Sequence, residues 1–207
     1  MQEDEMKTRI AVLVSGGGTN LQALIDAQES GILKSGQIVT VISSKAGVMA
    51  LERAEKAGIR ARAVPRKDYG CQKDFEKAII EELETQKVQL IVLAGFLSII
   101  SEDFVKKYER RIINVHPSLI PSFCGQGFYG LKVHEEALKR GVKVTGATVH
   151  FVNEIPDGGE IIAQKAVQVE EGDTAEILQR RVMEQAEWIL LPRAVEQVSE
   201  QILKEPD

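Results

Sequence analysis

The chain has 207 residues, 43% of them hydrophobic and 28% charged, which is ordinary for a soluble globular protein. A net charge of −5 without a basic stripe argues against a nucleic-acid partner, and no apolar run is long enough for a membrane span. No secretory leader is visible and Cys71 and Cys124 call for no disulfide, so we expect a cytoplasmic protein. The length suits a single domain over residues 1–207, in which residues 1–6 form a flexible tail.

Apolar runs alternate with helical patterns through the first half of the chain. Strands are expected over residues 8–14, 38–42, 59–64, 90–94 and 111–116. Helices are expected between them, over 21–25, 48–57 and 75–83, with a shorter helix that Ser101 can cap. This alternation predicts an α/β fold with a mostly parallel, Rossmann-like sheet flanked by helices.

The last third of the chain follows a different pattern. Two runs rich in β-branched residues, 144–151 and 160–169, predict an antiparallel C-terminal extension of the sheet. A long helix is expected over 174–191, and Pro192 should end or kink it. His134 is expected on the surface of an amphipathic helix, and His150 at a strand end closer to the other polar residues.

A glycine-rich turn follows the first strand, with the sequence Ser15-Gly16-Gly17-Gly18-Thr19-Asn20. Glycine lets the backbone approach a ligand closely, and the following helix offers free N–H groups to an anion such as a phosphate. The turn matches neither the dinucleotide fingerprint nor a P-loop, which disfavours a dehydrogenase or a kinase. The alternative is a tight turn in which Thr19 or Asn20 caps the helix.

Asn114 and His116 end the fifth predicted strand, two residues apart and therefore on the same face. An amide that donates hydrogen bonds, beside an imidazole that can carry a proton, can stabilise a negative oxygen in a transition state. The carboxyl end of a strand is also where open α/β sheets bind ligands. A single histidine at this place would usually be a buried, hydrogen-bonded core residue, but the neighbouring amide and the upstream glycine turn favour a functional site.

Asp157 precedes two glycines in the loop between the last two strands. A carboxylate near an imidazole favours the charged ring, so Asp157 is expected to raise the pKa of His116. The alternative is an aspartate that merely caps its own turn. The spacing of the three histidines supports no metal site, and we expect no metal.

Four blocks in this order resemble the glycinamide ribonucleotide formyltransferase family, folate-dependent enzymes of purine synthesis. The blocks are Val14-Ser15-Gly16-Gly17-Gly18-Thr19-Asn20-Leu21-Gln22, Leu93-Ala94-Gly95-Phe96, Ile113-Asn114-Val115-His116-Pro117-Ser118-Leu119, and His150-Phe151-Val152 through Asp157-Gly158-Gly159. The resemblance extends from Lys7 to about Val195. It implies the formyltransferase fold, with a phosphate-binding half over about 7–110 and a catalytic and folate half over about 111–207.

The resemblance also implies roles for individual residues. The catalytic residues would be Asn114, His116 and Asp157, and the ribonucleotide would be bound by Gly18, Thr19, Asn20 and Glu187. Folate would contact Leu97, Ser98, Ile99, Ile100 and Asn114. Ser98 and Gln72 stand where the family often has arginines, and Lys73 or Arg66 could replace the missing contact.

The implied activity is transfer of the formyl group from 10-formyltetrahydrofolate, a co-substrate, to the amine of glycinamide ribonucleotide. Formyltetrahydrofolate hydrolase and methionyl-tRNA formyltransferase are rivals, but both usually carry a further domain, and the tRNA enzyme needs a basic surface. A folate or nucleotide carrier without catalysis is a third alternative. The protein would be a monomer or a homodimer, and residues 126–130, which hold two aromatic side chains between glycines, would form a flap beside the site.

Overall fold

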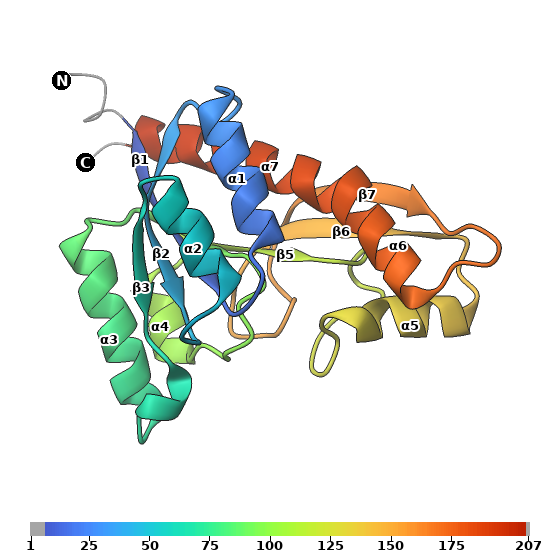
Figure 1. The fold of residues 1–207 in the computed structure, drawn as a ribbon, viewed down its shortest axis with the longest axis horizontal. Helices are drawn as coiled ribbons and strands as arrows, with labels where there is room; N and C mark the ends of the chain where they lie inside the picture. Colours follow the sequence, from blue (N-terminus) through green and yellow to red (C-terminus); the bar gives the residue numbers. More distant parts are fainter. Residues whose placement is uncertain (1–6, 206–207) are drawn as a thin grey trace.

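The computed structural model describes residues 7–205, so the predicted tail at residues 1–6 lies outside the described range. Its centre is a seven-stranded sheet with the spatial order β3-β2-β1-β4-β5-β6-β7 (Figure 1). The strands are β1 (Thr8–Val14), β2 (Gly36–Ser43), β3 (Arg60–Ala63), β4 (Leu90–Leu93), β5 (Ile112–His116), β6 (Val144–Phe151) and β7 (Ile161–Gln168). Each lies where the sequence predicts a strand, with ends that differ by no more than two residues.

The direction of the strands changes once across the sheet. β1 to β5 pair in parallel, whereas β6 pairs antiparallel with both β5 and β7. The mostly parallel sheet and its antiparallel C-terminal extension are therefore confirmed. Parallel strands are buried on both faces, which is why β4 is apolar along its length and β1 is apolar from Ile10 onward, while the outer strand β7 mixes apolar and polar residues.

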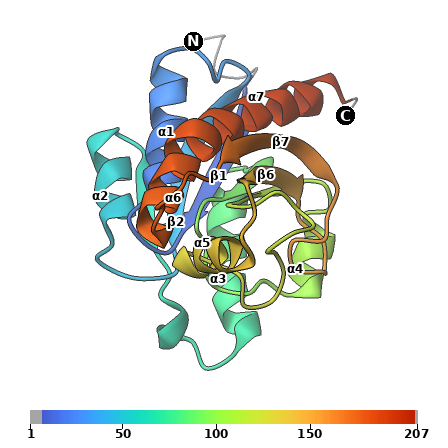
Figure 2. The same cartoon turned by 90° about the vertical axis from the view of Figure 1, so that its right-hand side faces the viewer.

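Helices cover both faces of the sheet (Figures 1 and 2). They are α1 (Thr19–Glu29), α2 (Met49–Lys56), α3 (Gln72–Thr85), α4 (Glu102–Lys107), α5 (Leu131–Arg140), α6 (Ala175–Val182) and α7 (Trp188–Lys204), together with a 3₁₀ turn, η2 (Arg66–Asp68). The side chains of α1, α2, α6 and α7 pack on one face, and those of α3 and α4 pack on the other. Among the helices within residues 7–205, none is long and apolar enough to cross a membrane.

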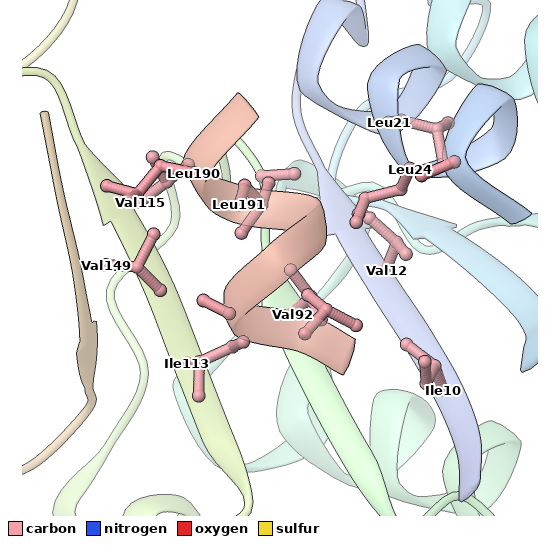
Figure 3. Close-up of a cluster of buried hydrophobic side chains, with 14 of the residues drawn as sticks. Ile10, Val12, Leu21, Leu24, Val92, Ile113, Val115, Val149, Leu190 and Leu191 are labelled. Atoms are coloured by element: carbon pink, nitrogen blue, oxygen red, sulfur yellow. The ribbon is translucent and has the colours of Figure 1, made fainter. Parts of the chain in front are cut away.

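The larger core lies between α1, α7 and the middle of the sheet (Figure 3). Leu190 and Leu191 of α7 lie over the strands that carry Ile113, Val115 and Val149, and the side chains of α1 lie over β1 (Figure 3). The alternate residues of β1 point to the other core, where they meet α3. One apolar strand thus holds both helical layers together.

Of the two expectations for Pro192, an end of the helix at this residue is wrong. Pro192 lies inside α7, which continues to Lys204. The irregular segment comes earlier, as a π turn (η3, Met183–Glu187) between α6 and α7. Pro192 lies in the first turns of α7, directly after this π turn. Proline removes one N–H from the i to i+4 ladder, and the π turn has already interrupted that ladder just before it.

The chain reverses its direction of winding at β1, because β2 and β3 extend the sheet on one side of it and β4 and β5 on the other. The carboxyl ends of β1, β4 and β5 consequently meet at one edge. In open α/β sheets such a switch point leaves a crevice between the outgoing loops. The glycine turn after β1 and the polar end of β5 are brought to this crevice.

Truncating Leu191 should strongly destabilise the fold, because this side chain of α7 is fully buried against the sheet. Leu191→Ala should lower the free energy of unfolding by about 2 to 5 kcal/mol, because the lost burial and the cavity add up. Leu203→Ala in the same helix is the control, since Leu203 is 42% exposed and should cost much less. Urea unfolding followed by circular dichroism measures both, and equal losses would contradict this packing.

Candidate active site

The crevice at the switch point is a pocket of about 470 Å³, within the usual size range of small-molecule sites. Its walls come from the turn after β1, the segment after β4, the end of β5, and the loop before α5. The residues predicted from the sequence that line it are Gly18, Thr19, Asn20, Leu97, Asn114, His116, Asp157 and Glu187. Segments up to about 170 residues apart in the chain therefore converge on one cavity.

The glycine turn ends at Gly18, which is the N-cap residue of α1. Gly18 has φ 73°, and a Cβ placed there would lie 2.7 Å from the Cβ of Ala50, so only glycine fits without strain. Within residues 7–205, no side chain caps the first turn of α1. The alternative of a turn capped by Thr19 or Asn20 is therefore wrong. Without a side-chain cap, the N–H groups of this turn and the positive end of the helix dipole are available to an anion.

Asn20 instead bonds to a residue at the other end of the chain. Its Nδ2 donates to Oε2 of Glu187 at 2.6 Å, and both side chains are buried. Burial raises the pKa of Glu187 above its ordinary value, and the Asn20 hydrogen bond only partly offsets this effect. Glu187 is the last residue of the π turn, so this irregular segment delivers a carboxyl group to the pocket.

Asn114 is held by the strand next to it. Asn114 pairs with His150 across β5 and β6, and its Nδ2 lies 3.2 Å from His150 Nε2. Because His150 Nδ1 lies 2.8 Å from the Phe151 carbonyl oxygen, the network assigns the proton to Nδ1, and Nε2 accepts from the amide. Through its second hydrogen, Asn114 Nδ2 also donates to Asp157 Oδ1, with 3.5 Å between the two heavy atoms. That longer contact is the one that a ligand oxygen can replace.

His116 lies between two acceptors. Its Nε2 is 2.8 Å from the carbonyl oxygen of Phe123 and its Nδ1 is 3.5 Å from Oδ2 of Asp157. The short bond to Phe123 assigns the proton of the neutral ring to Nε2, so a second proton would be added on Nδ1, facing the carboxylate. The structure thus brings Asp157 to both His116 and Asn114.

The charge of His116 differs from the sequence expectation. Burial lowers the pKa of His116 and outweighs Asp157 and the Phe123 carbonyl, which both raise it; nearby His150 lowers it slightly further. Asp157 does raise the pKa of His116, as expected, but the net shift is downward because burial is the larger effect, so the expected charged ring near neutral pH is wrong for the free protein. The ring is therefore mainly neutral at pH 7. Asp157 reduces the downward shift of the His116 pKa but does not reverse it.

Asp157 is placed by an unusual backbone conformation. It has φ 55°, a left-handed value that aspartate tolerates better than most residues, and its Oδ2 accepts a 2.8 Å hydrogen bond from Gly125 N–H. Burial alone would raise the pKa of Asp157, but the His150 ring, the nearby His116 and the Gly125 bond together hold it below its ordinary value. A Cβ on Gly159 would fall 1.7 Å from the Phe151 carbonyl oxygen, so the second glycine lets the loop lie this close.

His134 is the residue that the sequence analysis misplaced. It is fully buried and lines the pocket, neither ring nitrogen has a partner among the described residues, and burial lowers its pKa to about 4. The expected surface position is wrong because His134 lies on the buried stripe of α5 with Val133 and Ala137. Those apolar neighbours in the helix were the signal that could have placed it.

The segment predicted to contact folate, residues 97–100, reaches the pocket at its first residue. Leu97 lines the cavity, whereas Ser98, Ile99 and Ile100 continue away from its lining, and Ile99 is 84% exposed. Arg66 and Lys73 are not part of the lining; the Arg66 guanidinium donates to the Tyr69 carbonyl and lies over the Phe75 ring.

The segment 126–130, predicted as a flap, also borders the pocket. Phe128, Tyr129 and Gly130 line it, and Tyr129 is 62% exposed. Among the described residues no three His, Cys, Asp or Glu side chains cluster as metal ligands would.

An open α/β sheet with acid–base side chains and an uncapped helix N-terminus at its switch point is typical of enzymes that act on small anionic substrates. A more specific class is given by the family model described as formyl transferase, which matches residues 8–195. The chain belongs to the formyl transferase family. The family resemblance drawn from the four sequence blocks is confirmed.

Individual relatives and solved structures show which members of the family the chain is similar to. The trifunctional purine biosynthetic protein adenosine-3 of Gallus gallus is 48% identical over 193 residues, which are 93% of this chain but 18% of that protein. The phosphoribosylglycinamide formyltransferase of Haemophilus influenzae is 38% identical, over 96% of this chain and 91% of the relative. The crystal structure of glycinamide ribonucleotide transformylase 1 from Symbiobacterium toebii superposes with a TM-score of 0.88 at 40% identity, covering 95% of this chain and 89% of that one.

The geometry predicts how the charge of His116 responds to its neighbour. The imidazolium is present below the pKa of His116 and is lost as the pH rises through it. Asp157→Asn should lower that pKa further, because the residue that raises it most loses its charge. Titration of the ring proton by NMR measures the shift; an unchanged or higher pKa in the variant would contradict the contact.

Proposed function

We propose that the protein transfers the formyl group of 10-formyltetrahydrofolate to the amine of phosphoribosylglycinamide, in purine biosynthesis. The observation that carries this proposal is the convergence of Asn114, His116 and Asp157 on the pocket that also contains the uncapped start of α1. One part of the pocket suits acyl transfer and the other suits a phosphate. The named bacterial relatives, with which the chain aligns over most of their length, support the same activity.

The acyl-transfer step needs a stabilised oxyanion. The substrate amine attacks the formyl carbon, and the carbonyl oxygen becomes negative as the tetrahedral intermediate forms. The Asn114 amide can exchange its longer hydrogen bond to Asp157 for one to this oxygen, while the bond to His150 keeps the amide plane in place. A donor fixed in advance in a partly buried site stabilises the developing charge without reorganising water.

The reaction also needs two proton transfers, for which His116 and Asp157 are placed. The amine gains a positive charge on attack and must lose a proton, and the folate nitrogen must gain one before it leaves. The developing oxyanion favours the charged form of His116, whose second proton lies on Nδ1 opposite Asp157. The pair can therefore receive a proton and return it, directly or through water, within one pocket.

The ribonucleotide is bound on the other side of the cavity. The phosphate accepts from the N–H groups of Gly18, Thr19 and Asn20 at the start of α1. Glu187 lies beside them through its bond with Asn20, and a carboxylate there can accept hydrogen bonds from the ribose hydroxyls. This arrangement directs the glycinamide amine toward the end of β5.

The folate co-substrate occupies the mouth of the pocket along residues 97–100 and Asn114. The exposed side chains of Leu97 and Ile99 offer apolar surface to a pterin ring. Because Ser98 and Gln72 are neutral, the remaining candidates for a charge contact with folate are Arg66 and Lys73. Both substrates are small molecules, and no metal is required by these steps.

Several wider expectations remain predictions. They are a cytoplasmic location, a monomeric or homodimeric state, and a single domain in which about 7–110 binds phosphate and about 111–207 supplies catalysis. The pocket draws its lining from both parts, since Leu97 comes from the first and Glu187 from the second.

Removing the catalytic groups should affect turnover much more than folding. We expect His116→Ala and Asp157→Asn each to lower kcat by about 100- to 1,000-fold, since each disturbs stabilisation of the oxyanion. The absorbance change on conversion of formyltetrahydrofolate measures the rate, and formate release without ribonucleotide tests for hydrolase activity. Asp103→Asn, on the exposed side of α4, is the control. Wild-type turnover in both folded pocket variants would refute these roles.

The phosphate contact makes a separate prediction. Gly18→Ala should raise KM for the ribonucleotide by about tenfold or more, because the clash with Ala50 and the strained φ displace the start of α1. Gly58→Ala is the matched control: Gly58 has φ 68° and open space around it, after the end of α2. It should lower the melting temperature and leave this KM unchanged. Equal effects on KM would contradict a phosphate site at Gly18.

A further inference from the structure

Glu76 in α3 is a buried carboxylate that no catalytic step uses. It is 6% exposed, and within residues 7–205 no lysine, arginine or histidine nitrogen forms an ion pair with it. Its oxygens instead accept three short hydrogen bonds, from Ser101 N–H at 2.6 Å, Ser101 Oγ at 2.5 Å and Gln72 Nε2 at 2.7 Å. A buried carboxylate without a cation is costly unless such bonds satisfy it.

These bonds hold one end of the segment 97–101. Ser101 is the last residue of the segment, and Gln72 Nε2 also donates to the Ile99 carbonyl oxygen at 2.7 Å. At the other end, Leu97 N–H donates to Ser15 Oγ at 2.9 Å. The backbone groups of Leu97, Ile99 and Ser101 are therefore all hydrogen-bonded to side chains elsewhere in the protein. The last two of these bonds are made by Gln72 and Glu76.

The tied segment presents apolar surface outward. Leu97 is 56% exposed and Ile99 is 84% exposed, although both are large and hydrophobic. Folding gains little from fixing apolar side chains in water. A set of polar bonds that fixes them there fits a surface shaped in advance for an apolar ligand.

We propose that Glu76 is a positioning residue for folate: through Ser101 and Gln72 its carboxylate holds residues 97–100 in the conformation that receives the co-substrate. The inference rests on the proposed function, because that function assigns folate to this segment. It adds a residue from a helix outside the pocket, which contacts neither substrate. It also gives Gln72 a role of its own, as the link between Glu76 and Ile99.

The same helix provides a matched control. Glu82 is also a buried carboxylate of α3, but its oxygens bond to Arg60 and Arg62 of β3. Among the described residues, its hydrogen bonds and ion pairs join it to Thr40, Arg60 and Arg62, and none joins it to the segment 97–101. Replacing Glu82 disturbs α3 and the outer edge of the sheet, whereas replacing Glu76 disturbs α3 and the folate segment.

The test measures tetrahydrofolate binding by calorimetry and the KM of each substrate, in the full chain. Glu76→Ala removes all three acceptors and should weaken tetrahydrofolate binding by about tenfold or more, the size expected when bonds to a charged acceptor are lost. KM for formyltetrahydrofolate should rise in parallel, with kcat at saturation and the ribonucleotide KM unchanged. Glu76→Gln keeps one oxygen for Ser101 N–H and Gln72, and should recover much of the affinity.

Glu82→Gln should lower the melting temperature without weakening tetrahydrofolate binding. The inference is overturned if Glu76→Gln and a folded Glu76→Ala both bind tetrahydrofolate as the wild type does, or if Glu82→Gln weakens it as much as they do. If Glu76→Ala does not fold, Gln72→Ala takes its place, because it removes the link between Glu76 and the Ile99 carbonyl oxygen. Wild-type tetrahydrofolate affinity in that variant overturns the inference. A wild-type protein that neither binds tetrahydrofolate nor transfers a formyl group overturns the proposed function itself, which separates the two failures.

Discussion

The meeting of the carboxyl ends of β1, β4 and β5 at one edge of the sheet is the constraint on which the other features depend. β1 lies between β2 and β4, so the chain must leave it in one direction and return on its other side. The turn after β1, the segment after β4 and the end of β5 then enclose one cavity. The anion-binding helix start, the apolar rim and the acid–base residues are adjacent for this reason alone.

Within this cavity a single carboxylate organises the polar groups. Asp157 faces His116 through one oxygen and Asn114 through the other, and a backbone N–H of Gly125 fixes its orientation. The left-handed backbone at Asp157 and the close contact of Gly159 with β6 bring a loop residue to a strand end. The antiparallel strands β6 and β7, which carry the loop, hold this strained backbone conformation in place.

The mostly parallel sheet and its antiparallel extension were predictable because most of the strands are short apolar runs separated by helical patterns. Gly18 and Asn114 could be placed as well, since the turn chemistry and the two-residue spacing depend on the local chain. The π turn before α7 could not be, because the same residues fit an uninterrupted helix and only packing selects the wider turn. His134 was misplaced because one polar residue on an apolar stripe was assigned to the wrong face.

The charge of His116 marks a different limit. The sequence suggested a carboxylate beside the ring, and the structure has one, yet the desolvation that the fold imposes is the larger effect. How far a side chain is removed from water depends on every segment that closes the pocket, including Phe128 and Tyr129. Spacing along the chain carries no such information.

The most direct test of the central claim follows the formyl group itself. The protein is incubated with phosphoribosylglycinamide and with 10-formyltetrahydrofolate labelled with ¹³C in the formyl carbon, and the products are analysed by mass spectrometry. We predict that the label appears on the ribonucleotide as its N-formyl derivative, in amounts equal to the tetrahydrofolate formed. Label recovered as free formate, or unreacted co-substrate despite tight binding of both molecules, would contradict formyl transfer as the function of this site.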